Sequence, residues 1–269
     1  MTASTAVAKR DEAVKGTLEV LDRPQFQAQL HEALPPSVSV ERFTRTAKLA
    51  VQLNPDLIEV QDKQSIFTSL VRCAFDGLIP DGRQAALVKV KERGKEKVAY
   101  WPMVGGLRFI AANHGYSLES HCVYSNDTFA WELGFEPKVT HTPPSLDEDR
   151  GDLIGAYAVA TRLEGGRKFV DVMSKGEIEA IRAKSPSARF DWSPWNTSTS
   201  EMYRKTPARR LFKQLPLGDL EEHEHRVVVS DAEVEESTAS VPALANLPDV
   251  DPEIEEVEGE VVDVDGQDA

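Results

Sequence analysis

Basic residues end at Arg226, and this division of charge limits which part of the chain can fold into a core. All 31 Lys and Arg residues lie in the first 226 positions, whereas 14 of the 45 Asp and Glu residues lie in 231–269. A segment this acidic, built of short Val/Glu and Val/Asp units, buries too little apolar surface to offset the entropy lost on folding. We therefore expect residues 227–269 to form a disordered acidic tail and residues 25–226 to form one folded core.

The net charge of −14 belongs to that tail, so it does not argue against nucleic acid as a partner of the core. The first 24 residues are small and polar, and we expect them to be disordered. No apolar run approaches the roughly 18 residues of a membrane helix, and no signal peptide is visible. Cys73 and Cys122 are too few for a disulfide framework. These features predict a cytoplasmic protein without a membrane partner.

Apolar residues at helical spacing mark the first part of the chain. Phe26, Leu30 and Leu34 recur every four residues, and Pro35 follows them. The same reasoning, with a capping box at Ser174 to Glu177, predicts helices at Gln25–Leu34, Val40–Leu53, Gln64–Asp76, Leu107–His114 and Lys175–Lys184.

After Gly82 the texture changes to short β-rich runs separated by turn residues. The runs predict three hairpins: 85–91 with 97–101, 118–124 with 128–133, and 154–163 with 168–173. Residues 138–142 add a short strand. N-terminal helices, antiparallel β-hairpins and C-terminal helices in one domain make the expected fold class α+β.

The first hairpin has lysines on alternate positions of its strands. With residues 92–96 as the turn, Lys89, Lys91 and Lys97 would share one face, opposite Val88 and Val90. This pattern predicts a basic surface that can contact DNA. The alternative is an ordinary exposed edge that lysines protect from pairing.

The second basic surface is the segment 201–216, which we expect to be helical. It contains no acidic residue between its first and last cation, and the cations are Arg204, Lys205, Arg209, Arg210 and Lys213. Lys205, Arg209 and Lys213 recur every four residues and would form one stripe on a helix. Such a stripe suits a phosphate chain. The alternative is a solvated basic face.

Trp192 and Trp195 precede this segment in a polar loop, where they could stack unpaired bases. Their alternative role is to fix the loop to the core. No catalytic or metal-binding motif is visible, and 77–84 lacks the Lys and hydroxyl of a phosphate-binding loop. We therefore predict a DNA-binding protein that is not an enzyme and uses no cofactor. A metal-dependent nuclease with scattered carboxylates is the remaining enzymatic alternative.

Three sequence blocks resemble the phage single-strand annealing proteins of the RecT/Redβ type, and RecT more closely. They are C-A-F-D-G-L-I-P-D-G-R-Q-A-A-L-V at 73–88, W-P-M-V-G-G-L-R-F-I-A-A-N-H-G at 101–115 and E-M-Y-R-K-T-P-A-R-R-L-F-K-Q-L-P at 201–216. By position, the resemblance implies that DNA contacts come from Lys205, Thr206, Arg209, Arg210 and Lys213.

The resemblance further implies binding of single-stranded DNA and annealing of complementary strands without ATP, by an oligomer in the form of a ring or helical filament. Implied partners are the annealed duplex intermediate, a phage 5′→3′ exonuclease and, through the tail, a host single-strand binding protein. The expected location is the cytoplasm of a bacterial host, from a phage or prophage gene. A protein that protects single strands without annealing them is the alternative.

Two features depart from the family pattern. Gly105 stands where many members have Arg or Lys, and Ala112 and Asn113 replace a basic pair. Pro207 lies inside the basic segment, where we expect it to start or kink the helix.

Overall fold

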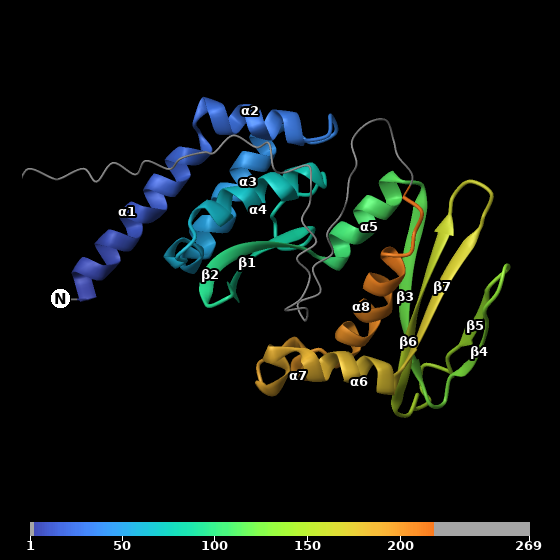
Figure 1. Cartoon of the computed structure of the whole chain (residues 1–269). Coiled ribbons are helices and arrows are strands. Elements are labelled where there is room, and N and C mark those ends of the chain that lie inside the picture. Colours follow the sequence, from blue (N-terminus) through green and yellow to red (C-terminus); the bar gives the residue numbers. More distant parts are fainter. Residues whose placement is uncertain (1–2, 218–269) are drawn as a thin grey trace, which may run out of the picture.

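The computed structural model describes residues 3–217 (Figure 1), so the predicted acidic tail at 227–269 lies outside the described residues. The chain begins with helices and a short 3₁₀ turn, and the helices predicted at 25–34, 40–53 and 64–76 are confirmed within one residue at each end. These elements are α1 (Ala3–Leu21), α2 (Pro24–Ala33), α3 (Val40–Leu53), η1 (Pro55–Glu59) and α4 (Gln64–Phe75).

The segment 1–24, for which we expected disorder, contains helix α1. Val20 and Leu21 at its end are buried, and Val14 and Leu18 pack against the same core. The spacing of Val14, Leu18 and Leu21 is that of one helix face. This apolar face indicates a helix, although the segment as a whole has a small and polar composition.

Strands β1 (Ala85–Glu92) and β2 (Lys95–Pro102) form the first predicted hairpin. Its turn has two residues, Arg93 and Gly94, both with positive φ (48° and 84°), which is the geometry that suits a tight antiparallel turn. Helix α4 covers the hairpin, because Ser65 Oγ accepts from Val98 N (2.8 Å) and Ser69 Oγ donates to Val98 O (3.0 Å).

A second, three-stranded antiparallel sheet has the order β3-β6-β7, formed by β3 (Tyr116–Tyr124), β6 (Leu153–Arg162) and β7 (Lys168–Ser174). The predicted hairpin of 154–163 with 168–173 is therefore confirmed. The predicted hairpin of 118–124 with 128–133 is wrong. Strand β4 (Thr128–Glu132) pairs with β5 (Lys138–Thr142) in a separate hairpin, and β3 pairs with β6.

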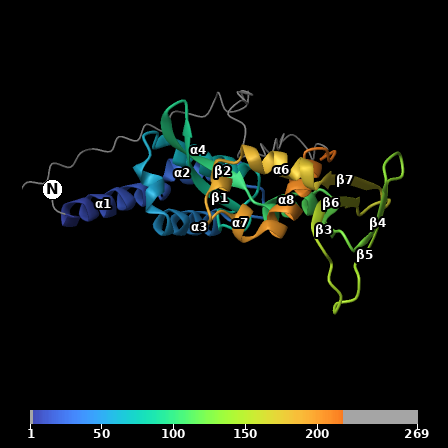
Figure 2. The ribbon, with the colours of Figure 1, turned by 90° about the horizontal axis from the view of Figure 1, so that it is seen from below.

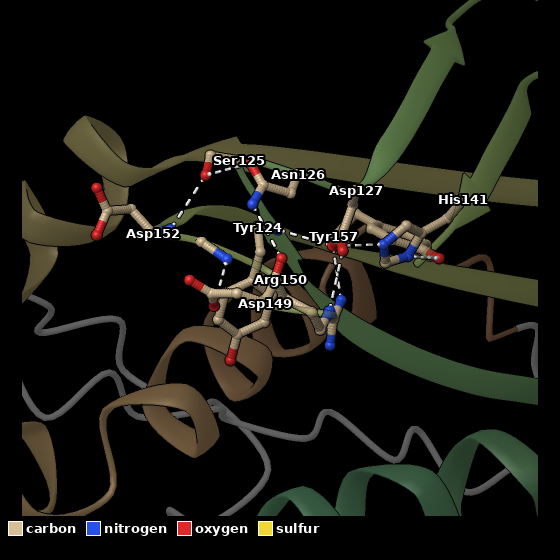
Figure 3. A network of polar contacts seen from close by, with 10 residues as sticks. Tyr124, Ser125, Asn126, Asp127, His141, Asp149, Arg150, Asp152 and Tyr157 are labelled. Carbon is tan, nitrogen blue, oxygen red and sulfur yellow. Dashed lines mark hydrogen bonds and ion pairs between the residues drawn. The ribbon is translucent and has the colours of Figure 1, made fainter. Parts of the chain in front are cut away.

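The turn after β3 explains this pairing (Figure 3). Ser125 N donates to Asp152 O (2.8 Å) and Asn126 N to Arg150 O (3.0 Å), which extends the β3–β6 contact into the turn. The fully buried Asp127 carboxylate accepts from Arg150 Nε (2.9 Å) and Nη2 (2.6 Å), and His141 Nε2 lies 2.9 Å away. The hydrogen bonds from Arg150 are the largest cause of a pKa shift at Asp127. Together with the contact of His141, they hold the pKa of this carboxyl well below its usual range.

The remaining helices are α5 (Val104–Asn113), α6 (Lys175–Lys184), η2 (Pro186–Arg189), α7 (Pro194–Thr197) and α8 (Thr199–Phe212). The capping box predicted for α6 is present, with Ser174 and Glu177 bonded to each other's backbone N–H. Helix α8 lies on one face of the three-stranded sheet beside α5 (Figure 1). Cys122 Sγ donates to Ser200 O of α8, which identifies that face.

Small side chains let α8 approach the sheet closely. Every second residue of β6 points to the face that α8 covers. Three of these residues are alanines that are fully buried, Ala156, Ala158 and Ala160. The C-terminal half of α8 belongs to the large core that also contains α1 to α5, whereas Met202 and Tyr203 belong to a second cluster around Trp195. Helix α8 therefore joins the two cores.

The molecule is elongated, with α1 at one end and the β4–β5 hairpin at the other in both views (Figures 1 and 2). Helices packed on purely antiparallel sheets confirm the α+β class. None of the helices in the described residues combines the length and the apolar character needed to cross a membrane.

Candidate nucleic-acid interface

Helix α8 carries the basic segment, and Pro207 does not start it. The helix begins eight residues earlier, at Thr199, and continues to Phe212. A proline inside a helix removes one N–H donor, but Pro207 is buried beside Ala208 and Leu211, whose packing holds the helix in place. Thr206 is also buried, and its hydroxyl donates to Met202 O (2.7 Å). The structure therefore gives Thr206 a role inside the helix, away from the surface.

Arg210 is fixed to the sheet and to α6. Its Nε and Nη2 each donate to one oxygen of Asp171 on β7 at 2.6 Å. Its Nη1 lies 3.3 Å from Glu177, and Nη2 donates to Val172 O (3.2 Å). The ion pair with Asp171 raises the pKa of Arg210, so the guanidinium stays charged. This arrangement sets the rotation of α8 on the sheet.

Arg209 joins the basic helix to the end of the first hairpin, because its Nη1 donates to Pro102 O (3.0 Å). Pro102 ends β2 two residues before the start of α5, so the second and third family-like blocks meet at this bond. The first block meets them through Gln84, whose carbonyl accepts from Met103 N (2.9 Å). Segments far apart in the sequence thus converge at the start of α5.

Glycines at the start of α5 make that convergence possible. A Cβ at Gly106 would lie 2.2 Å from Gln84 O, and one at Gly105 would lie 2.7 Å from Arg83 O. Real Cβ atoms do not approach backbone oxygens so closely. A longer side chain at position 105 would therefore require this loop to move.

We call Lys205, Arg209 and Lys213 the α8 cation strip. Lys205 and Arg209 are partly exposed, and Lys213 is exposed at the C-terminal cap of the helix. Arg204 lies one residue earlier and pairs with Glu201 on the same helix. The strip follows one side of α8 and reaches the end of β2 through Arg209.

The predicted basic face of the first hairpin is wrong. Directly opposed residues of an antiparallel pair share a face, and the register pairs Lys89 with Val98, but Val90 with Lys97. Lys97 is therefore on the face opposite to Lys89 and Lys91. Acidic neighbours also reduce the charge, because Lys89 Nζ lies 2.9 Å from Glu96 and Lys97 pairs with Glu92.

The two tryptophans of the loop before α8 have different environments. Trp195 is 4% exposed and belongs to the second core cluster, so the structure gives it a packing role and the prediction of base stacking for Trp195 is wrong. Trp192 is 68% exposed and stacks on Phe190. Only Trp192 of the pair has a ring face in solvent.

Sequence reasoning missed the acidic partners of the cations. Asp171 lies on a strand 39 residues before Arg210, and no local spacing connects the two. Among residues 3–217, no group of three or more His, Cys, Asp and Glu side chains is arranged to hold a metal ion.

The three sequence blocks lie within a match to a known protein family. A model of the RecT family matches residues 41–242, a range that contains all three sequence blocks. Protein RecT of Escherichia coli (strain K12) is 32% identical over 215 residues, which cover 76% of this chain and 78% of that protein. The resemblance seen in the sequence is confirmed, and the chain belongs to the RecT family.

Proposed function

We propose that this protein binds single-stranded DNA along the α8 cation strip and anneals complementary strands without ATP. Membership of the RecT family supports the broader assignment to recombination and strand annealing. The observation that carries the proposal is the α8 cation strip itself, held in place because Arg210 fixes the helix to Asp171 and Arg209 contacts Pro102. Preorganised cations lose little conformational freedom when a ligand binds.

The strip would contact phosphates and leave the bases available for pairing. Lys213, Lys205 and Arg209 are spaced along one side of the helix, as a phosphate chain requires. Lys91 is an exposed cation that can add to the field around the strand. Arg204, Lys89, Lys97 and Arg210 each pair with a carboxylate, which reduces the net charge that they add.

Binding through a few cations is weak for one subunit, so we propose that the protein acts as an oligomer. Neighbouring subunits on one strand would raise the effective concentration of each binding site without any new kind of contact. A ring or a helical filament would provide this arrangement. A 5′→3′ exonuclease that exposes single strands, and a host single-strand binding protein, are the proposed partners.

Mixing two labelled complementary strands with the protein, in the absence of ATP and metal ions, tests the proposal. Duplex formation should be faster than without protein. Slower duplex formation would indicate a protein that only protects single strands, and shortening of the strands after Mg²⁺ addition would indicate a nuclease. Either of these results would overturn annealing as the function.

A further inference from the structure

The loop between η2 and α7 presents an exposed stack of side chains. The Phe190 and Trp192 rings are stacked, with centroids 5.2 Å apart and planes at 10°, and the Arg189 guanidinium lies 4.8 Å from the Phe190 centroid. We call Arg189, Phe190 and Trp192 the aromatic platform. All three residues are exposed. Aromatic rings exposed beside a cation can stack on flat ligands.

The loop that carries the platform is held on both sides. Asn196 Nδ2 donates to Ala188 O (3.0 Å) and to Phe190 O (2.8 Å), while Arg182 Nη2 donates to Asn196 Oδ1. Trp195 is buried in the core, and the buried Ser193 side chain accepts from Trp195 N (3.3 Å). Since the backbone around it is fixed, the platform can bind a flat ligand at a small loss of conformational entropy.

Cations surround an open depression of about 420 Å³ beside the platform, between α6 and η2. Its charged lining residues are Glu179, Arg182, Lys184 and Arg189. Glu179 is already satisfied, because it lies 3.3 Å from Arg182 and accepts from Tyr203 of α8 (2.6 Å). Within residues 3–217, Lys184 and Arg189 make no ion pair, so the depression keeps a positive surplus despite the exposed Asp191 nearby.

We propose that the aromatic platform, with Lys184, is a nucleotide-binding site for single-stranded DNA, in which a base stacks on Trp192 and Lys184 and Arg189 contact the adjacent phosphates. The proposal rests on the proposed function and adds a second contact surface to it. Base stacking on aromatic rings beside cations is the usual means of holding single strands without reading their sequence. Glu179 connects the site to α8 through Tyr203, so both surfaces belong to one rigid unit.

The test compares two oligonucleotides of equal length, one of thymidines and one with abasic sugars that keep only the phosphates. Trp192→Ala should lower the affinity for the thymidine strand by about tenfold, the effect of losing one stacked base, and leave the affinity for the abasic strand unchanged. Trp192→Phe should restore most of the loss. The matched control is Trp131→Ala, which removes an exposed tryptophan of the β4–β5 hairpin and should change neither affinity.

The cations should behave differently from the ring. Lys184→Gln with Arg189→Gln should weaken binding of both strands and make it less dependent on salt. The site is overturned if Trp192→Ala lowers both affinities equally or neither, or if its only effect is a change in oligomer mass, which would indicate a protein interface. Because strand annealing by each variant is measured in parallel with the wild-type protein, failure at Trp192 with normal annealing leaves the proposed function intact.

Discussion

Arg210 of α8 holds Asp171 of β7 through two parallel hydrogen bonds of 2.6 Å, while the Asp171 side chain is 10% exposed and that of Arg210 is 39% exposed. A bidentate pair of this kind fixes orientation as well as contributing energy. In this fold it determines which side of α8 faces the sheet. The same pair therefore decides where Lys205, Arg209 and Lys213 lie.

Removal of Arg210 should lower the free energy of unfolding by about 1.5–3 kcal/mol, because Asp171 would remain buried and charged without its partner. Asp171→Ala should cost less, since the freed guanidinium reaches solvent. Chemical denaturation of both variants and the double variant measures the coupling between them. Arg204→Ala, which breaks the exposed pair with Glu201, is the control and should change stability by under about 1 kcal/mol. Strictly additive effects of the two variants would contradict this role.

Gly106→Ala should destabilise the fold by about 1–3 kcal/mol or more, because the new methyl group would overlap Gln84 O and the Leu78 side chain. Thermal unfolding measures the effect. The control is Gly16→Ala inside α1, where a Cβ meets nothing within 4 Å. That change should be neutral or stabilising by up to about 1 kcal/mol, since alanine favours helices. Equal melting temperatures for the two variants would show that the contact at α5 is not tight.

Asp76 should make stability depend on pH. Burial raises its pKa to about 7, although Tyr100 OH donates to it at 2.8 Å. The folded state therefore keeps a proton on Asp76 that the unfolded chain loses near pH 4. Stability due to this group is full below about pH 4, and declines as the pH rises to about 7.

Asp76→Asn isolates this contribution, because the amide oxygen can still accept from Tyr100 but cannot ionise. The stability of the variant relative to wild type should increase between about pH 4 and about pH 7 and then stay constant. Asp127 affects stability in the opposite direction, since its lowered pKa gives stability that is lost as the pH falls. A difference in stability between wild type and Asp76→Asn that does not change with pH would contradict the assignment to Asp76.

Local patterns predicted most of the elements, because periodicity and turn residues act over a few positions. The β3 pairing was not predictable in this way. Its partner β6 begins about 30 residues later, and the choice depends on the contacts that bind Asp127 to Arg150 and His141. Helix α1 was missed because its apolar face is short and interrupted by charged residues.

The first hairpin shows how one turn assignment changes a surface. A five-residue turn at 92–96 places Lys97 with Lys89 and Lys91. The two-residue turn at Arg93 and Gly94 shifts the register and moves Lys97 to the other face. The cations of α8 were visible in the sequence, but Asp171, which holds Arg210, belongs to a distant strand. The sequence shows which residues of α8 are cations. Which of these cations are paired with a carboxylate depends on the tertiary structure.

The salt dependence of single-strand affinity tests the α8 cation strip most directly. Lys205 and Lys213 are the residues to change, because substitutions at Arg209 and Arg210 would also disturb packing. Lys205→Gln with Lys213→Gln should reduce the slope of log affinity against log salt by about 1.4, since each single-strand phosphate contact contributes about 0.7. Lys138→Gln with Lys168→Gln, two exposed lysines on β5 and β7, should leave the slope unchanged. An unchanged slope in the α8 variant, with wild-type stability and oligomer mass, would contradict the assignment of DNA binding to this helix.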